Sequence, residues 1–217
     1  MYHSPKWAPL ADRAYWTEIR SYKHYMVIGS ELEGNGIQIF DMTKLLDLTA
    51  EEIPKKFTNE DDLTGHWDEL LPIGSTHNVV VNEEKNYGVA VGARPRDQGC
   101  FGGLHFFSLD DPSNPETLGC NGEDGYVHDA QCLIYRGPHE KYQGKDICYG
   151  YNEDTLTIYD VTNKANSTII SRTSYTGAAY THQGWLNDPN WQEFLFMDDE
   201  YDEYDVTEPA LDGYPVT

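Results

Sequence analysis

The sequence predicts an all-β fold: a β-propeller of four-stranded antiparallel blades, with about four blades in this chain. Short runs in which apolar and polar residues alternate predict strands, and turn residues between the runs predict tight connections. The pattern recurs with a histidine near its start, and His77, His128 and His182 lie 51 residues (77 to 128) and 54 residues (128 to 182) apart. Propeller blades repeat every ~40 to 50 residues, whereas helical solenoid repeats are shorter.

Each repeat is expected to contribute four strands. In the repeat that contains His77, the first strand is expected at 78–82 and the second at 87–91, because both runs are rich in β-branched residues and flank a polar turn. Third strands that end in Asp or Pro turns are expected at 36–43, 103–115, 156–167 and 201–209. Fourth strands are expected at 115–120 and 167–173, which gives one domain with blades near 16–50, 76–120, 127–175 and 181–214.

The first repeat departs from this pattern in two ways. It has Thr17 where the other repeats have histidine. The segment 45–72, which follows it, is acidic and contains several turn residues. We interpret this segment as an excursion from the blade, either a binding loop or a decoration of the surface.

The charge balance excludes one class of partner. The chain has 15 Lys and Arg residues against 37 Asp and Glu residues, a formal net charge of -22. Because a phosphate backbone would be repelled, we expect no nucleic-acid partner and favour cations or basic partners. No run of roughly 18 or more apolar residues is present, so we expect no membrane span.

The four cysteines are expected to form two disulfides, with four buried free thiols as the alternative; the absence of a CxxC pair argues against zinc. Cys132 can face Cys148 across a hairpin, and Cys100 can face Cys120 in the same way. Residues Asn166-Ser167-Thr168 form an N-glycosylation acceptor pattern. Both features favour a secreted or cell-surface protein.

Several of these segments together resemble the LVIVD-repeat propellers of the choice-of-anchor B family. The segments are SELEGNGIQIFDMT (30–43), THNVVVNEE (76–84), CFGGLHFFSLDDPSNP (100–115), YVHDAQCLIYRGP (126–138), CYGYNEDTLTIYDVT (148–162) and YTHQGWL (180–186). The resemblance implies surface display and no defined reaction. Family members are longer, so the chain is interpreted as a fragment of a larger propeller or a trimmed reading frame, and its open blade edges invite self-association.

The recurring histidines are the strongest candidates for a site. Equivalent positions of propeller blades converge around the axis, and the second strands should end on the same face in carboxylates. Imidazole with carboxylate suits zinc, manganese, iron or copper, whereas carboxylates with backbone carbonyls suit calcium. The alternative is that the histidines only bond to neighbouring backbone carbonyls and the acidic ends are a solvated rim. The candidate ligands of a divalent metal are His77, His128, His182, Asp129, Glu153, Asp198 and Asp199, and the acidic strand ends also include Glu31 and Glu200.

Three functions are compatible with these features. The leading hypothesis is an extracellular binding or scaffold module for a protein or glycan partner, because no GxSxG, Walker, GxGxxG or HExxH motif is present. The second is a metal-dependent hydrolase or oxidase that uses the histidine ring. The third is a self-assembling subunit of an extracellular fibre or coat. Stoichiometric metal would separate the second from the others.

Overall fold

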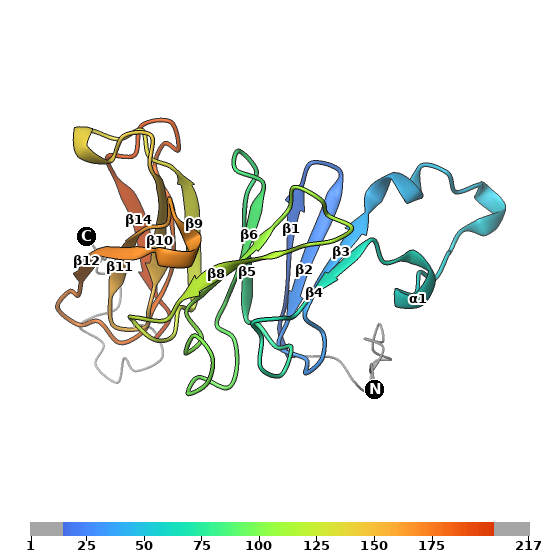
Figure 1. The fold of residues 1–217 in the computed structure, drawn as a ribbon, viewed down its shortest axis with the longest axis horizontal. Helices are drawn as coiled ribbons and strands as arrows, with labels where there is room; N and C mark the ends of the chain where they lie inside the picture. The colour runs from blue at the N-terminus through green and yellow to red at the C-terminus, as the bar shows by residue number, and fades with distance from the viewer. Residues whose placement is uncertain (1–14, 202–217) are drawn as a thin grey trace, which may run out of the picture.

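The computed structural model describes residues 15–201, whose strands form four antiparallel sheets (Figure 1). Three sheets have four strands each, and the last has two. The first contains β1 (Thr17–Tyr22), β2 (Tyr25–Ser30), β3 (Ile37–Asp41) and β4 (Gly65–Trp67). The second contains β5 (Asn78–Asn82), β6 (Tyr87–Val91), β7 (Leu104–Ser108) and β8 (Thr117–Asn121). The third contains β9 (Asp129–Ile134), β10 (Asp146–Tyr151), β11 (Leu156–Asp160) and β12 (Thr168–Thr173), and the last contains β13 (Thr181–Leu186) and β14 (Leu195–Asp199).

The described part of the chain contains only short helices. They are α1 (Asn59–Asp62) and the 3-10 turns η2 (Met42–Leu45), η3 (Ala50–Glu52), η4 (Glu140–Tyr142) and η5 (Lys164–Asn166). The prediction of an all-β fold with four-stranded antiparallel units is therefore confirmed for three sheets. No helix among residues 15–201 is long and apolar enough to cross a membrane.

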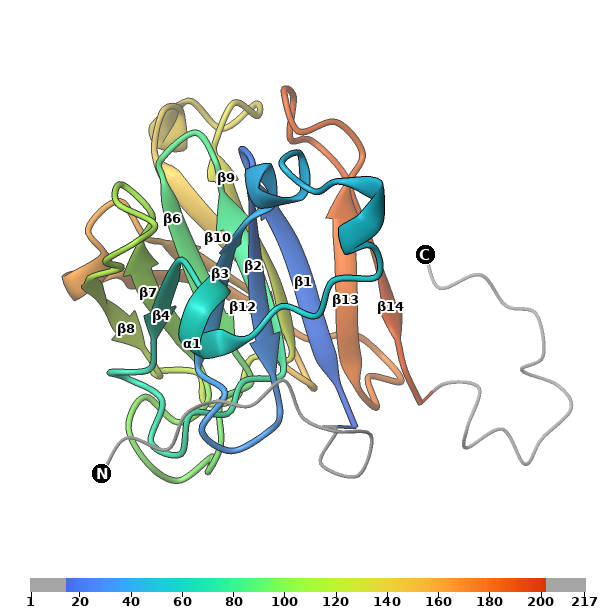
Figure 2. The same ribbon diagram turned by 90° about the vertical axis from the view of Figure 1, so that its right-hand side faces the viewer.

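The sheets pack face to face in chain order. The first strands β1, β5, β9 and β13 are successive neighbours, and the first sheet lies at the right of Figure 1 and the last at the left. Strand β6 is buried along its whole length because a sheet covers each of its faces, whereas β1 alternates between exposed and less exposed residues. Figure 2 shows β1 beside β2 in the first sheet.

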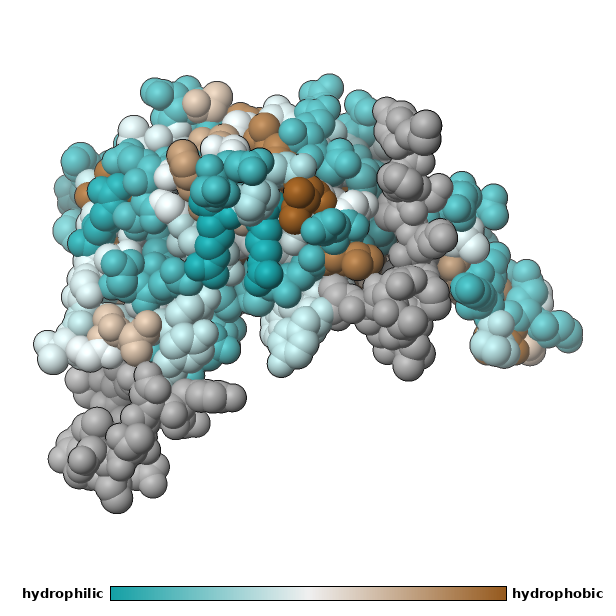
Figure 3. All heavy atoms as spheres, turned by 90° about the horizontal axis from the view of Figure 1, so that it is seen from below, coloured by the Kyte–Doolittle hydropathy of each residue, from teal (hydrophilic) through white to brown (hydrophobic). Residues whose placement is uncertain are grey.

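One apolar cluster fills each junction between consecutive sheets. Val27, Ile39 and Trp67 of the first sheet pack with Phe107 of the second. The next junction contains Val89 and Phe106 with Cys148 and Tyr159, and the third contains Ile147 and Tyr149 with Leu186. These clusters set the sheet-to-sheet geometry. The face of the molecule seen in Figure 3 is mostly hydrophilic, with hydrophobic residues in separate patches.

The segment 45–72 differs from the prediction because it contains the fourth strand of the first sheet. Strand β4 pairs with β3, so the first sheet extends to Trp67 and the excursion covers only 42–64. The Trp67 ring is buried, lies 4.9 Å from the Phe107 ring, and its Nε1 donates to Thr117 Oγ1 at 2.9 Å. A strand of three residues has too little alternation to be recognised from sequence.

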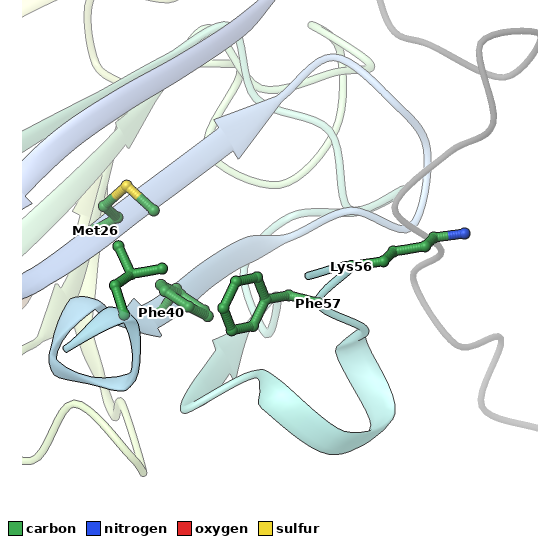
Figure 4. Close-up of a pocket in the computed structure, with 5 residues that line it drawn as sticks. Met26, Phe40, Lys56 and Phe57 are labelled. Carbon is green, nitrogen blue, oxygen red and sulfur yellow. The ribbon is translucent and has the colours of Figure 1, made fainter. Parts of the chain in front are cut away.

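The excursion and the first sheet line a small apolar cavity that is open to solvent on one side. The cavity has a volume of about 290 Å³ and is lined by Met26, Phe40, Leu45, Phe57 and the stem of Lys56. Figure 4 shows the rings of Phe40 and Phe57 facing one another while Lys56 extends away from them. The two rings meet edge to face with centroids 5.0 Å apart.

The last sheet has two strands in the described part of the chain. The third strand predicted at 201–209 lies outside the described residues except for Tyr201, as does the end of the blade predicted at 181–214. A cavity of about 520 Å³ lies between the third sheet and the β13–β14 loop, lined by Ile158 and Ile170 on one side and Phe194 on the other.

The cysteines pair as the sequence predicted. Cys132 and Cys148 are in register across β9 and β10, with Cα atoms 4.1 Å apart. Cys100 pairs with Cys120, with Cα atoms 6.2 Å apart. The first pair lies in the core between the second and third sheets, whereas Cys100 and Cys120 are only partly buried.

A buried histidine in β7 predicts a loss of stability in acid. His105 is fully buried and its Nδ1 donates to the Gly103 carbonyl at 3.0 Å. Burial lowers the pKa of His105 below 6.5, and hydrogen bonds to the backbone of Gly103 and Ala90 offset this only in part. The stability that neutral His105 contributes is therefore present above the unfolded pKa and is lost as the pH falls below it.

We expect the free energy of unfolding in urea to fall less between about pH 7 and about pH 5 in His105→Gln than in the wild type. Glutamine does not titrate here and keeps an amide donor for Gly103. Other histidines titrate in both proteins, so the difference between the two pH profiles isolates His105. Parallel profiles would contradict the prediction.

Candidate functional site

Four consecutive sheets each contribute one aromatic ring to a row. The ring centroid of His128 lies 4.4 Å from that of His77 and 4.4 Å from that of His182. Trp16 extends the row, because its ring stacks on His77 at 5.2 Å. The row follows from the packing of the first strands side by side, since each ring lies at the start of one of them.

The position assigned to Thr17 is wrong by one residue. Thr17 pairs with Ser30 at the end of β2, just as Asn78 pairs with Val91 at the end of β6. Thr17 therefore corresponds to Asn78, and Trp16 corresponds to His77. An aromatic ring, and not a hydroxyl, takes the histidine position in the first sheet.

All three histidines use Nδ1 for a hydrogen bond. His77 Nδ1 lies 2.8 Å from Glu31 Oε1, His182 Nδ1 lies 3.3 Å from Asp198 Oδ2, and His128 Nδ1 lies 2.9 Å from the carbonyl oxygen of His182. Because carboxylates and carbonyls only accept, Nδ1 carries the proton in each ring. Nε2 then holds the lone pair of the neutral imidazole, which is the arrangement of metal-binding histidines.

His128 is the central and most buried member of the row. It is only 5% exposed. Burial, together with the neighbouring His77 and His182, lowers the pKa of His128 from 6.5 to about 3. The ring is therefore uncharged at neutral pH. Its bond to the His182 carbonyl also joins the third sheet to the last, as the alternative interpretation of the histidines predicted.

Among the described residues, one group could hold a metal ion. His128, His182 and Glu200 each offer a donor atom, and these atoms all lie within 4.8 Å of one another. Glu200 follows β14 directly, and its backbone N–H donates to the Tyr180 carbonyl at 3.0 Å. His77 is next to His128 in the row, but it is not part of this group.

The sequence alone does not single out Glu200 as a ligand among the acidic residues at the end of β14. The sequence predicts Asp198 and Asp199 as ligands there, but Asp198 accepts from His182 Nδ1 and from the Gln183 N–H at 3.0 Å. Since residues two apart along a strand share a face, the period of the strand could have identified Glu200 once Asp198 was placed beside His182.

The other predicted carboxylates make contacts outside this group. Asp199 accepts from the backbone N–H groups of Ala179 and Tyr180, both at 2.8 Å, and so holds the loop before β13. Asp129 is buried, and burial raises its pKa from 3.8 to about 6. Asp129 accepts from the Ala130 N–H at 2.8 Å.

Two arginines neutralise the acidic ends of the first and third sheets. Arg96 Nη1 donates to Glu153 Oε1 at 2.7 Å, and the Arg96 guanidinium lies over the Tyr126 ring at 3.5 Å. Arg94 Nη2 donates to Glu31 Oε1 at 3.2 Å. The predicted ligand Glu153 is therefore an ion-pair partner of Arg96. The carboxylates nearest His182 are Asp198 and Glu200, at 3.3 and 3.9 Å.

No protein-family model matches the chain, and no curated protein is similar to it. The resemblance to the choice-of-anchor B family stays a prediction.

Proposed function

We propose that the chain is an extracellular binding module built from β-propeller blades, and that its histidine row holds one divalent transition-metal ion. The observation that carries the proposal is the grouping of His128, His182 and Glu200, whose donor atoms lie within 4.8 Å of one another. His128 is uncharged at neutral pH because burial lowers its pKa to about 3. An uncharged imidazole can bind a cation without first losing a proton.

The donor set favours a transition metal over calcium. Two imidazole nitrogens and one carboxylate suit zinc, manganese, iron or copper, whereas calcium prefers six to eight oxygen ligands. The Nδ1 atom of His128 donates to the His182 carbonyl, and that of His182 donates to Asp198. These bonds orient both rings and increase their basicity as ligands.

Three features support the rest of the proposal. The first strands lie side by side, as is expected of propeller blades about an axis. The two cysteine pairs are typical of oxidising compartments. Asn166 of the glycosylation pattern is exposed, in η5. The partner proposed for this module is the one expected from the sequence, a protein or a glycan.

Metal analysis of the untagged protein tests the proposal. We expect about one zinc ion per chain after loading and desalting, and His182→Gln should weaken binding by at least about tenfold, because one of three ligands is lost. The imidazole of His24 is half-exposed and lies 3.9 Å from Asp41, so His24→Gln is the matched control and should bind as the wild type does. Equal binding by His182→Gln and the wild type would refute the site.

A metal-dependent enzyme is the second candidate, because the group supplies only three protein ligands. Catalytic zinc sites use three protein ligands and leave a position for water or substrate, whereas structural sites use four. Ester and phosphoester hydrolysis by the zinc-loaded wild type, absent in His182→Gln, would favour this candidate over a binding module.

A further inference from the structure

The last sheet has an aromatic face on the side away from the third sheet. Trp185 of β13 and Phe196 of β14 are directly opposed across the strands and are 61% and 71% exposed. Phe194 directly precedes β14 and is 64% exposed, and the alternation along the strand places it on the same side as Phe196. Leu186 points the other way, into the cluster between the third and last sheets. Exposed aromatic rings that are grouped on one surface indicate a site for a partner.

The aromatic face is bordered by acidic residues. Asp198 lies two residues after Phe196, on the same side of β14, and its side chain is 53% exposed. Glu193 of the β13–β14 loop is exposed, and its Oε2 accepts from Trp191 Nε1 at 3.0 Å. No Lys or Arg follows Arg172 in the chain. The last sheet therefore has no Lys or Arg of its own to offset these carboxylates.

Elsewhere in the molecule, cations of the chain itself contact carboxylates and aromatic rings. Lys145 pairs with Asp160 in the third sheet. The Arg96 guanidinium lies over the Tyr126 ring and pairs with a carboxylate as well. Among residues 15–201, no Lys or Arg lies over a ring of the aromatic face. Rings and carboxylates are both exposed on the last sheet without the cations that such groups attract.

We propose that the aromatic face binds a basic segment of a partner protein, with Arg or Lys side chains over the rings and beside the carboxylates. A guanidinium or ammonium group is attracted by the face of an aromatic ring and by a carboxylate alike. Arg suits the face best, because its planar guanidinium stacks on a ring and still donates at its edge. The proposal names the partner of the binding module and so rests on that function, but not on its metal ion.

Charge complementarity favours a basic protein over the other occupants of an aromatic surface. A second copy of the chain has a formal net charge of -22, so it would be repelled. A neutral sugar ring stacks on aromatic side chains, but it gains nothing from the negative charge of Asp198 and Glu193. A basic segment is the occupant that uses both the rings and the carboxylates.

Calorimetric titration with a peptide of alternating Arg and Ser tests the proposal. We expect the wild type to bind this peptide with an affinity that falls as salt is added, and not to bind the matched peptide of alternating Glu and Ser. The double variant Trp185→Ser with Phe196→Ser should bind about tenfold more weakly, because two cation–π contacts are lost. Phe101→Asn is the control, because Phe101 is an exposed aromatic residue of another loop and Asn tolerates its φ of 55°. Equal binding by the double variant and the wild type would overturn the proposal.

Two variants that each remove one negative charge locate the contact. Glu193→Gln should weaken binding of the Arg peptide by about threefold, whereas Glu116→Gln, at an exposed residue of the β7–β8 loop, should bind as the wild type does. Equal effects of the two variants would mean that the peptide responds only to net charge, and would overturn the proposal.

Two further measurements separate this proposal from the function on which it rests. Binding of an N-acetylglucosamine oligomer in place of the Arg peptide would overturn the basic partner and leave a glycan-binding module. Zinc binding is measured in parallel, and the double variant should bind zinc as the wild type does because it keeps His128, His182 and Glu200. Loss of peptide binding alone refutes the aromatic face, and loss of zinc binding alone refutes the metal site.

Discussion

Asp146→Ala is expected to lower the free energy of unfolding by about 3 kcal/mol, because it removes a buried carboxylate and leaves a partly buried cation without its partner. The Asp146 side chain is 4% exposed and forms an ion pair with Lys164, whose side chain is 15% exposed. Asp146 Oδ1 also accepts from the Tyr87 hydroxyl at 2.8 Å and from Asn82 Nδ2 at 3.2 Å. This one carboxylate therefore joins the second sheet to the third.

Urea unfolding measures this loss, provided that the free energy of unfolding depends on urea concentration with the same slope in the variant and the wild type. In the double variant Asp146→Ala with Lys164→Met no charge is left unpaired, so the double variant should recover part of the stability. Glu84→Ala removes the exposed ion pair of Glu84 with Arg136 and should cost less than about 1 kcal/mol. If Asp146→Ala lowered the free energy of unfolding no more than Glu84→Ala does, the contacts of Asp146 would not stabilise the junction between the second and third sheets.

The second large effect is expected from the disulfide between Cys132 and Cys148. Its sequence separation is 16 residues, and constraining a loop of that length in the unfolded chain stabilises the fold by about 3 kcal/mol. Cys132 is 5% exposed and Cys148 is fully buried, so replacing both with alanine also removes packing in the core between two sheets. We expect a loss of about 3 kcal/mol or more in urea.

Reduction provides an independent measurement. Cys100 and Cys120 are only partly buried, so a thiol reductant should open their bond first in the native protein, whereas the bond between Cys132 and Cys148 should open only with unfolding. Alkylation and mass spectrometry during reduction follow the order. Opening of Cys132–Cys148 first, or a double alanine variant as stable as the wild type, would contradict the prediction.

Much of the fold could be predicted from the sequence because each strand depends on residues that are close together in the chain. Alternation at 78–82 and 87–91 coincides with β5 and β6 to the residue, and the cysteine pairs follow from placing each pair across an antiparallel hairpin. The sequence does not predict strand β4, since three residues after a long acidic excursion leave no alternating pattern. The burial of Trp67 that holds β4 in place depends on Phe107 of another sheet.

The candidate site could be predicted only in part. The spacing of His77, His128 and His182 indicated that the rings would lie close together, and they do. Their partners could not be read from that spacing: Glu31 lies 46 residues before His77, and their contact depends on how the first sheet packs on the second. A local sequence pattern does not predict such a contact, because the packing of one sheet on another joins residues that are far apart in the chain.

By itself, the sequence determined the all-β class, the repeated unit, the histidine positions and the cysteine pairs, since each depends on periodicity within one repeat. Tertiary structure alone decided that Trp16 stands in the histidine row, that Glu200 joins His128 and His182, and that Glu153 pairs with Arg96. These contacts depend on strand register and on the packing of separate sheets. A shift of one residue in register reverses which side chains face the row, and only the folded chain determines the register.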